Sequence, residues 1–101
     1  LIPAQTMGSS ENELLLEATN LFKAGKILEG RQQLMQYIAL YPTKIEDVYR
    51  WMYDNLSIWS DTLEGQDQAI VEIRQGIVNH AIVADPEINL SATLVKLSQI
   101  T

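Results

Sequence analysis

The chain has 101 residues, no cysteine and a formal net charge of −6, from 13 acidic and 7 basic side chains. This length fits one domain, and an apolar fraction of 47% with 20% charged residues is typical of a folded globular protein. Without cysteine there are no disulfides or thiolate metal sites, and the cytoplasm is the default compartment. The acidic charge disfavours direct contact with nucleic-acid phosphates, and no apolar run reaches the ~20 residues of a membrane span.

Residues 1–9 show no periodicity and are predicted to be a linker or tail from an upstream module, which leaves residues 10–101 as one helical domain. Ser10 and Glu13 fit a capping box that opens the first helix, and Gly25 follows its end. The apolar stripe of this helix is Leu14, Leu15, Ala18, Leu21 and Phe22.

A second helix is predicted over 27–40, because Tyr41 and Pro42 then stop the helical pattern. Arg31 projects into the middle of its apolar stripe. Either the stem of Arg31 lies along the stripe with the guanidinium in water, or the guanidinium forms a buried or intersubunit pair. The predicted stripe is Ile27, Leu28, Leu34, Met35 and Ile38.

Thr43 and Glu46 fit another capping box, which predicts a third helix that extends to about Ser60. Trp51 and Ile58 are expected to lie well off its inward face and are weaker candidates for an interface. The residues expected inward are Ile45, Val48, Met52, Leu56 and Trp59.

Two further helices are predicted, over 66–83 and 86–100, after an acidic turn at residues 61–65. Gly76 makes the fourth helix less regular, whereas Asp85 and Pro86 are a strong start for the fifth. No segment has the pattern of a strand, so the prediction is an all-α, compact five-helix bundle.

Both of these helices carry apolar residues on opposite sides, and a small bundle buries only one side of each easily. Burying an aliphatic side chain contributes about 1.5–3 kcal/mol, so several exposed ones indicate a surface for a protein partner. In the fourth helix one face holds Ala69, Ile70, Ile73, Ile77 and Ala81, and the other holds Val71, Val78 and Ile82. In the fifth helix the two faces are Leu90, Leu94 and Leu97, and Ile88, Ala92 and Val95. The predicted interface residues are Val71, Val78, Ile82, Ile88, Val95, Trp51, Ile58 and Arg31.

No motif for catalysis, phosphate binding or metal binding is present, so we expect no catalytic, cofactor-binding or metal-binding residue. His80 is the single histidine and is predicted to be a packed structural residue. Asp61, Glu64 and Asp67 lack the spacing of a calcium loop and are interpreted as a solvated turn.

The stretch from Leu21 to Leu34 resembles the start of the C-terminal collar domain of clamp-loader small subunits, in which a short helix, a glycine turn and an Ala/Gly-Arg-x-x-Leu helix recur. Ile45–Val48 and Glu72–His80 are similar to the openings of later helices, and Glu87–Leu97 is similar to the terminal helix. The spacing fits the T-even-type phage version best. At Asp85, cellular relatives usually have glycine.

The resemblance implies a five-helix domain that assembles with copies of itself and with a related subunit into a pentameric ring. This ring holds together ATPase modules that load a sliding clamp onto primer–template DNA, so DNA and clamp are met only indirectly, in the cytoplasm of a host cell, and no membrane is involved. The full-length protein would be an AAA+ ATPase. ATP and magnesium would bind an upstream module, so no cofactor is expected in this segment.

Two other functions remain open from the residues. Helix pairs of about this size also build helical-repeat adaptors, although the two halves of the chain show no self-similarity. A small acid–base enzyme would need His80 to converge with Asp85 or Glu87 in a pocket.

Overall fold

The computed structural model describes residues 9–41 and 45–100, so Thr43 and residues 1–8 of the predicted tail lie outside the described residues. Ser9, which was predicted to belong to the tail, is the first residue of the first helix. Within these ranges the chain forms five α-helices, a short 3-10 helix and no strand, which confirms the all-α fold. No helix in the described part is long and apolar enough to cross a membrane. The elements are α1 (Ser9–Lys23), α2 (Ile27–Leu40), α3 (Ile45–Asp54), η1 (Leu56–Ile58), α4 (Leu63–His80) and α5 (Pro86–Ser98).

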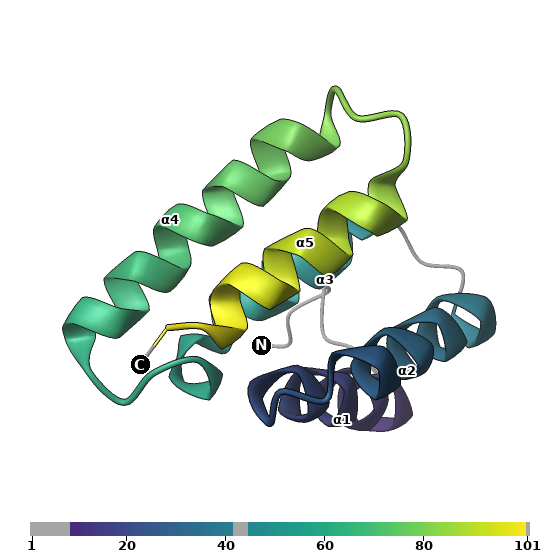
Figure 1. Cartoon of the computed structure of the whole chain (residues 1–101), viewed down its shortest axis with the longest axis horizontal. Coiled ribbons are helices and arrows are strands. Elements are labelled where there is room, and N and C mark those ends of the chain that lie inside the picture. The colour runs from purple at the N-terminus through teal and green to yellow at the C-terminus, as the bar shows by residue number, and fades with distance from the viewer. Residues whose placement is uncertain (1–8, 42–44, 101) are drawn as a thin grey trace, which may run out of the picture.

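The helices form two hairpins, α1–α2 and α4–α5, which are joined through α3 (Figure 1). Helix α3 packs against both α4 and α5, and α1 also contacts α5. Nε1 of Trp51 on α3 donates a hydrogen bond of 2.7 Å to Oδ1 of Asn12 on α1. The bundle is therefore compact, with α3 and α5 at its centre.

The turn between α1 and α2 is the glycine turn that the sequence predicts. Gly25 has a φ of +82°, in the left-handed region where residues with a side chain are strained. The Lys26 amide donates to the Leu21 carbonyl at 2.9 Å, and the Gly25 amide donates to the Phe22 carbonyl at 3.0 Å. These bonds satisfy the last carbonyls of α1, as at many helix C-termini.

Helix α3 is shorter than predicted, because it ends at Asp54 rather than near Ser60. The side-chain amide of Asn55 donates to the Trp51 carbonyl at 2.8 Å, and the Asn55 backbone amide turns to the Met52 carbonyl. A local side-chain bond of this kind competes with helix continuation. The chain then makes the tighter turn of η1 instead.

Helix α4 begins within the segment predicted as an acidic turn. Thr62 is its N-cap, since its Oγ1 accepts a hydrogen bond of 3.0 Å from the Gly65 amide. Helix α5 begins where predicted, with Asp85 Oδ1 accepting from the amides of Glu87 at 3.0 Å and Ile88 at 3.3 Å. Both caps satisfy amides that have no partner within the helix.

The core uses one of the two predicted faces of α5, the stripe of Leu90, Leu94 and Leu97. On α4 it takes Ala69 and Ile73, whereas two other members of the same predicted face, Ile77 and the C-cap residue Ala81, are exposed. The largest fully buried side chains include Trp59, Tyr37, Tyr49, Phe22, Leu15, Leu34 and Met52.

The predicted stripe of α2 is wrong at two positions, since Leu28 and Met35 are exposed. A Cβ atom on Gly30 would lie 2.8 Å from Cδ2 of Phe22, so the absence of a side chain at Gly30 lets α2 approach α1 closely there. The face of α2 that contains Gly30 is therefore turned inward, together with Leu34 and Tyr37.

Candidate interaction surface

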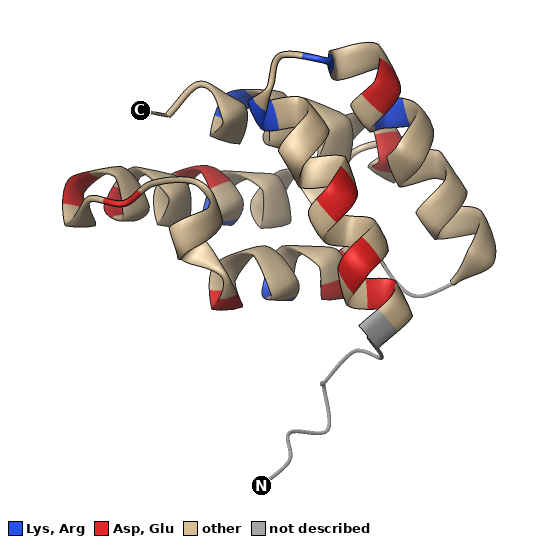
Figure 2. Cartoon of the chain, turned by 90° about the horizontal axis from the view of Figure 1, so that it is seen from below, with Lys and Arg blue, Asp and Glu red and all other residues tan. Residues whose placement is uncertain are grey.

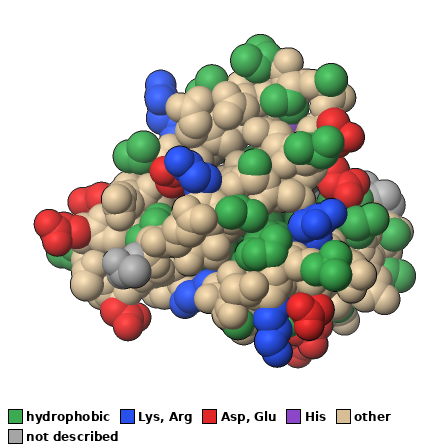
Figure 3. All heavy atoms as spheres, viewed as in Figure 1, with side chains coloured by type: hydrophobic (Ala, Val, Ile, Leu, Met, Phe, Trp, Pro, Cys, Tyr) green, Lys and Arg blue, Asp and Glu red, His purple; other side chains and the backbone are tan. Residues whose placement is uncertain are grey.

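Four large aliphatic side chains on α4, in the α4–α5 connection and at the start of α5 are exposed to solvent. The exposed fractions are 63% for Val71, 44% for Val78, 79% for Ile82 and 68% for Ile88. We call these four residues the outer surface. Apolar side chains stand out around the α4–α5 connection in the space-filling view (Figure 3). All four were predicted interface residues, and none of them is taken up by the core of the chain.

The α4 part of the outer surface is a straight ridge. At 100° per residue, Val71 and Val78 project about 20° apart on α4, and Ile82 follows in the turn just after the helix, where its amide donates to the Asn79 carbonyl at 3.0 Å. Glu64 and Asp67 project on the same side near the start of α4, where acidic residues gather in the chain (Figure 2). The ridge therefore presents aliphatic side chains separated by the exposed Gln75, and it is acidic at its N-terminal end.

The other predicted interface residues differ in their positions. Trp51 is only 6% exposed and belongs to the core, so the expectation that it lies off the inward face is wrong. Ile58 and Val95 are half-buried and pack against the core. Arg31 is exposed, and among the described residues it has no ion-pair partner, so it is not a buried pair within this chain.

A second set of exposed apolar residues lies on α2 and comprises Leu28, Met35 and Leu40. Leu28 and Met35 project about 20° apart, but Leu40 projects about 120° from Leu28. This set does not form a straight ridge. The i, i+4, i+7 spacing of Gly30, Leu34 and Tyr37 marks the buried face of α2 and could have revealed the exposure of this set.

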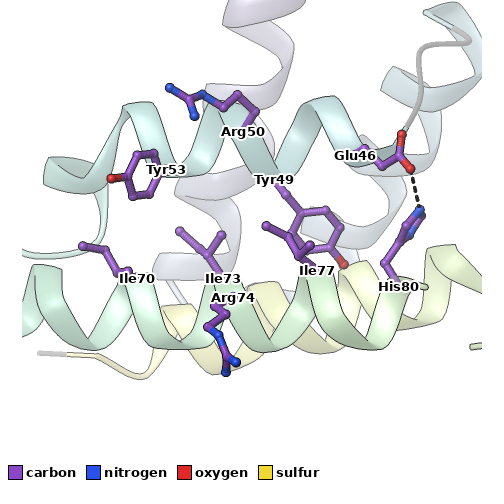
Figure 4. A pocket seen from close by; sticks show the side chains of 9 residues that line it. All are labelled: Glu46, Tyr49, Arg50, Tyr53, Ile70, Ile73, Arg74, Ile77 and His80. Atoms are coloured by element: carbon purple, nitrogen blue, oxygen red, sulfur yellow. Dashed lines mark ion pairs between the residues drawn. The ribbon is translucent and has the colours of Figure 1, made fainter. Parts of the chain in front are cut away.

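A groove with a volume of about 350 Å³ lies between α3 and α4 (Figure 4). It is lined by a different side of α4 from the one that carries the outer surface. The floor of the groove is apolar, because four of its lining side chains lie between the two helices: Tyr53, Ile70, Ile73 and Ile77. Tyr53 and Ile77 are also well exposed. The full lining is Glu46, Tyr49, Arg50, Tyr53, Ile70, Ile73, Arg74, Ile77 and His80.

Two arginines stand on opposite rims of the groove. Arg50 rises from α3, forms an ion pair of 3.2 Å with Asp54 and lies 5.3 Å from the centre of the Tyr53 ring. Arg74 rises from α4 and has no ion-pair partner among residues 9–41 and 45–100. Sequence reasoning did not single out these arginines. The i, i+4, i+7 pattern of Ile70, Arg74 and Ile77 is the signal that could have placed Arg74 beside an apolar strip.

His80 closes one end of the groove. Its Nε2 lies 3.7 Å from Oε2 of Glu46, its ring meets Tyr49 edge-on at 6.0 Å, and its Nδ1 is buried without a hydrogen-bond partner. Asp85 and Glu87 form no ion pair with His80 and do not line the groove that His80 closes.

Tyr49 is the buried link between α3, α4 and α5. Its hydroxyl accepts a hydrogen bond of 2.9 Å from Nδ2 of Asn89, which also donates to the Gly76 carbonyl at 2.9 Å. Burial raises the pKa of the Tyr49 phenol above its ordinary value, because the phenolate would lose hydration, and hydrogen bonds to Thr93 and Asn89 offset part of this rise. The phenol is thus a neutral structural group beneath the groove.

Within the described part of the chain, no group of three or more histidine or acidic side chains is arranged to hold a metal ion. Asp61, Glu64 and Asp67 are exposed around the start of α4, as expected for a solvated turn and helix end. The groove and the outer surface offer apolar contact and charge, and these are the means of protein–protein recognition.

Comparison of the chain with protein-family models, with curated proteins and with solved structures found no match.

Proposed function

We propose that this chain is a non-catalytic oligomerisation domain whose outer surface is covered by another copy of the chain or by a related subunit. The observation that carries the proposal is the exposure of four large aliphatic side chains, Val71, Val78, Ile82 and Ile88, on α4, in the α4–α5 connection and at the start of α5. Burying such side chains contributes about 1.5–3 kcal/mol each, which is large against a typical net stability of about 5–15 kcal/mol. Contact with another protein is the simplest way to gain this burial free energy.

The assembly that we propose is the collar of a clamp loader. This assignment rests on the resemblance of Leu21–Leu34, Ile45–Val48, Glu72–His80 and Glu87–Leu97 to collar-domain segments. These segments fall on the α1–α2 turn and on α3, α4 and α5 in that order. A ring needs each copy to touch two neighbours through different surfaces, and the chain offers an outer surface and a separate groove.

In this proposal the domain performs no chemistry itself. It joins ATPase modules that bind ATP and magnesium and that place a sliding clamp on primer–template DNA. The acidic charge of the chain suits a domain that stands away from the DNA, because it would repel the phosphates.

The first test is sedimentation velocity of the chain over a wide range of concentrations, with a double substitution of Val78→Asp and Ile82→Asp. We expect reversible self-association of the wild-type chain and a monomer for the double variant. Both side chains are exposed, so circular dichroism should report unchanged helicity. A matched control, Leu28→Asp with Met35→Asp on α2, adds the same charge at exposed apolar positions and should leave association unchanged.

A wild-type chain that stays monomeric at the highest concentrations would contradict self-association and would favour the adaptor alternative. Loss of helicity in the double variant would show that Val78 and Ile82 support the fold instead. The clamp-loader assignment has its own test, which is whether the full-length protein loads a ring-shaped clamp on primer–template DNA in an ATP-dependent manner.

A further inference from the structure

We propose that the groove between α3 and α4 of one copy binds the α4 ridge of a second copy, with Arg50 and Arg74 facing Glu64 and Asp67. This inference rests on the proposed function and deepens it, since it names the surface that receives the outer surface. It would make the contact a helix seated in a groove formed by two other helices, a common mode of recognition between proteins.

The chemistry of the groove defines what fits it. Its floor is apolar and partly open, and its rims carry two guanidinium groups, of which that of Arg50 already pairs with Asp54 whereas that of Arg74 has no carboxylate partner among the described residues. Glu46, the acidic residue in the groove lining, lies beside His80 at one end of the groove. An occupant with aliphatic side chains and a carboxylate within reach of Arg74 matches this lining.

The α4 ridge of the chain has this composition. Val71 and Val78 lie at i and i+7 on α4, a spacing with which a helix fills a groove, Ile82 follows in the turn after the helix, and all three are exposed. Glu64 and Asp67 supply exposed carboxylates next to them. The exposed apolar residues of α2 do not fit as well, because Leu40 projects away from Leu28 and Met35.

The charge distribution favours another copy as the occupant. The chain holds 13 acidic and 7 basic side chains, and two of those seven basic residues stand on the groove rims. Arg74 has no carboxylate partner within the described residues of its own chain. A carboxylate from a neighbouring ridge would provide one and would steer the two copies together.

The contact is head-to-tail, because the ridge and the groove lie on different sides of the same helix. Ile70 and Ile77 project into the groove, about 100° and 120° from Val71 on the ridge. One copy cannot fill its own groove with its own ridge. Helix α4 would thus touch two neighbours, one through the ridge and one through its wall of the groove. Heterologous contacts of this kind form a ring when the rotation between copies closes.

A charge exchange in the full chain tests this pairing by sedimentation velocity. Arg74→Glu and Asp67→Lys should each raise the dissociation constant of self-association about tenfold or more, because each places like charges across the contact. Combining both substitutions in one chain should restore association to near the wild-type level. An equimolar mixture of the two single variants should also associate, since each groove then meets a ridge of opposite charge.

Lys26→Glu is the matched control, because it makes the same charge change at an exposed turn between α1 and α2 and should leave association unchanged. Arg74→Gln should weaken association less than Arg74→Glu does, and circular dichroism should confirm that every variant is folded. The difference between wild type and Arg74→Glu should shrink in 1 M salt, where charges are screened within about 3 Å.

Wild-type association that Arg74→Glu leaves unchanged would overturn the groove as the binding site for a second copy and would leave the proposed function standing. Weakening without recovery in the combined variant would overturn the pairing of Arg74 with Asp67. A wild-type chain that is monomeric throughout would contradict the proposed function and this pairing together.

Discussion

At the residue scale, Tyr49 shows how one polar group holds three helices in register. Its side chain is buried on α3, and its hydroxyl meets Asn89 on α5, which in turn bonds the Gly76 carbonyl on α4. A buried phenol is stable because it remains neutral and hydrogen-bonded. The groove depends on this arrangement, since Tyr49 forms part of its lining.

The first residue-scale prediction concerns pH. The pKa of the Tyr49 phenol is raised in the folded chain. In the unfolded chain the phenol has its ordinary pKa of about 10, so as the pH rises the unfolded state loses this proton before the folded state does. The contribution of Tyr49 to the free energy of unfolding is therefore fully present below about pH 10 and falls as pH rises through the folded pKa.

The substitution Tyr49→Phe should cost about 0.5–1.5 kcal/mol at neutral pH, because it removes the hydrogen bond to Asn89. Above pH 10 the wild-type chain should lose stability that the variant does not lose. Urea denaturation at pH 8 and pH 11 should then show a smaller gap between the two proteins at the higher pH. A constant gap would contradict the raised pKa.

Some residues could be read correctly from the sequence, and others could not. The cap at Asp85 has a local signature, so its role was predictable. Gly76 lowers helix propensity in isolation, yet α4 is continuous there. A side chain at this position would not fit, because a Cβ atom would lie 2.6 Å from Cε1 of Tyr49. Long-range contact explains this glycine, and a single sequence does not contain that information.

At the element scale, the beginnings and ends of helices are set by a few side-chain hydrogen bonds. Asn55 ends α3 by bonding the Trp51 carbonyl, and Thr62 begins α4 by bonding the Gly65 amide. The sequence pattern of apolar residues continues past Asn55, so periodicity alone predicts too long a helix. Competing local bonds decided the end of α3.

The prediction at this scale concerns the cap of α5. Asp85→Ala should lower the free energy of unfolding by about 0.5–2 kcal/mol, because two amides at the start of α5 lose their acceptor. Asp85→Asn should retain most of the stability, since the amide oxygen can still accept. Asp61→Ala, at an exposed position without a cap bond, is the control for losing one carboxylate. An equal effect of both alanine substitutions in thermal denaturation would refute the role of the cap.

At the scale of the whole molecule, the sequence predicted that α4 and α5 have two apolar sides but did not determine which side is the core. Periodicity defines faces of a helix, whereas the close approach of neighbouring helices selects between them. The approach of α1 and α2 at Gly30 selected the buried face of α2 in this way. The groove was not predictable, because it is formed by side chains from two helices whose packing no local pattern specifies.

The outer surface is proposed to mediate association, whereas the stripe of Leu90, Leu94 and Leu97 is the core of the chain. The most direct measurement is methyl NMR of the chain at increasing concentration, with assigned valine, leucine and isoleucine methyls. We predict concentration-dependent shifts or broadening for Val71, Val78, Ile82 and Ile88, and constant signals for the three core leucines. Constant signals from the outer surface up to millimolar concentration, or changes confined to Leu28 and Leu40 on α2, would contradict association through the outer surface.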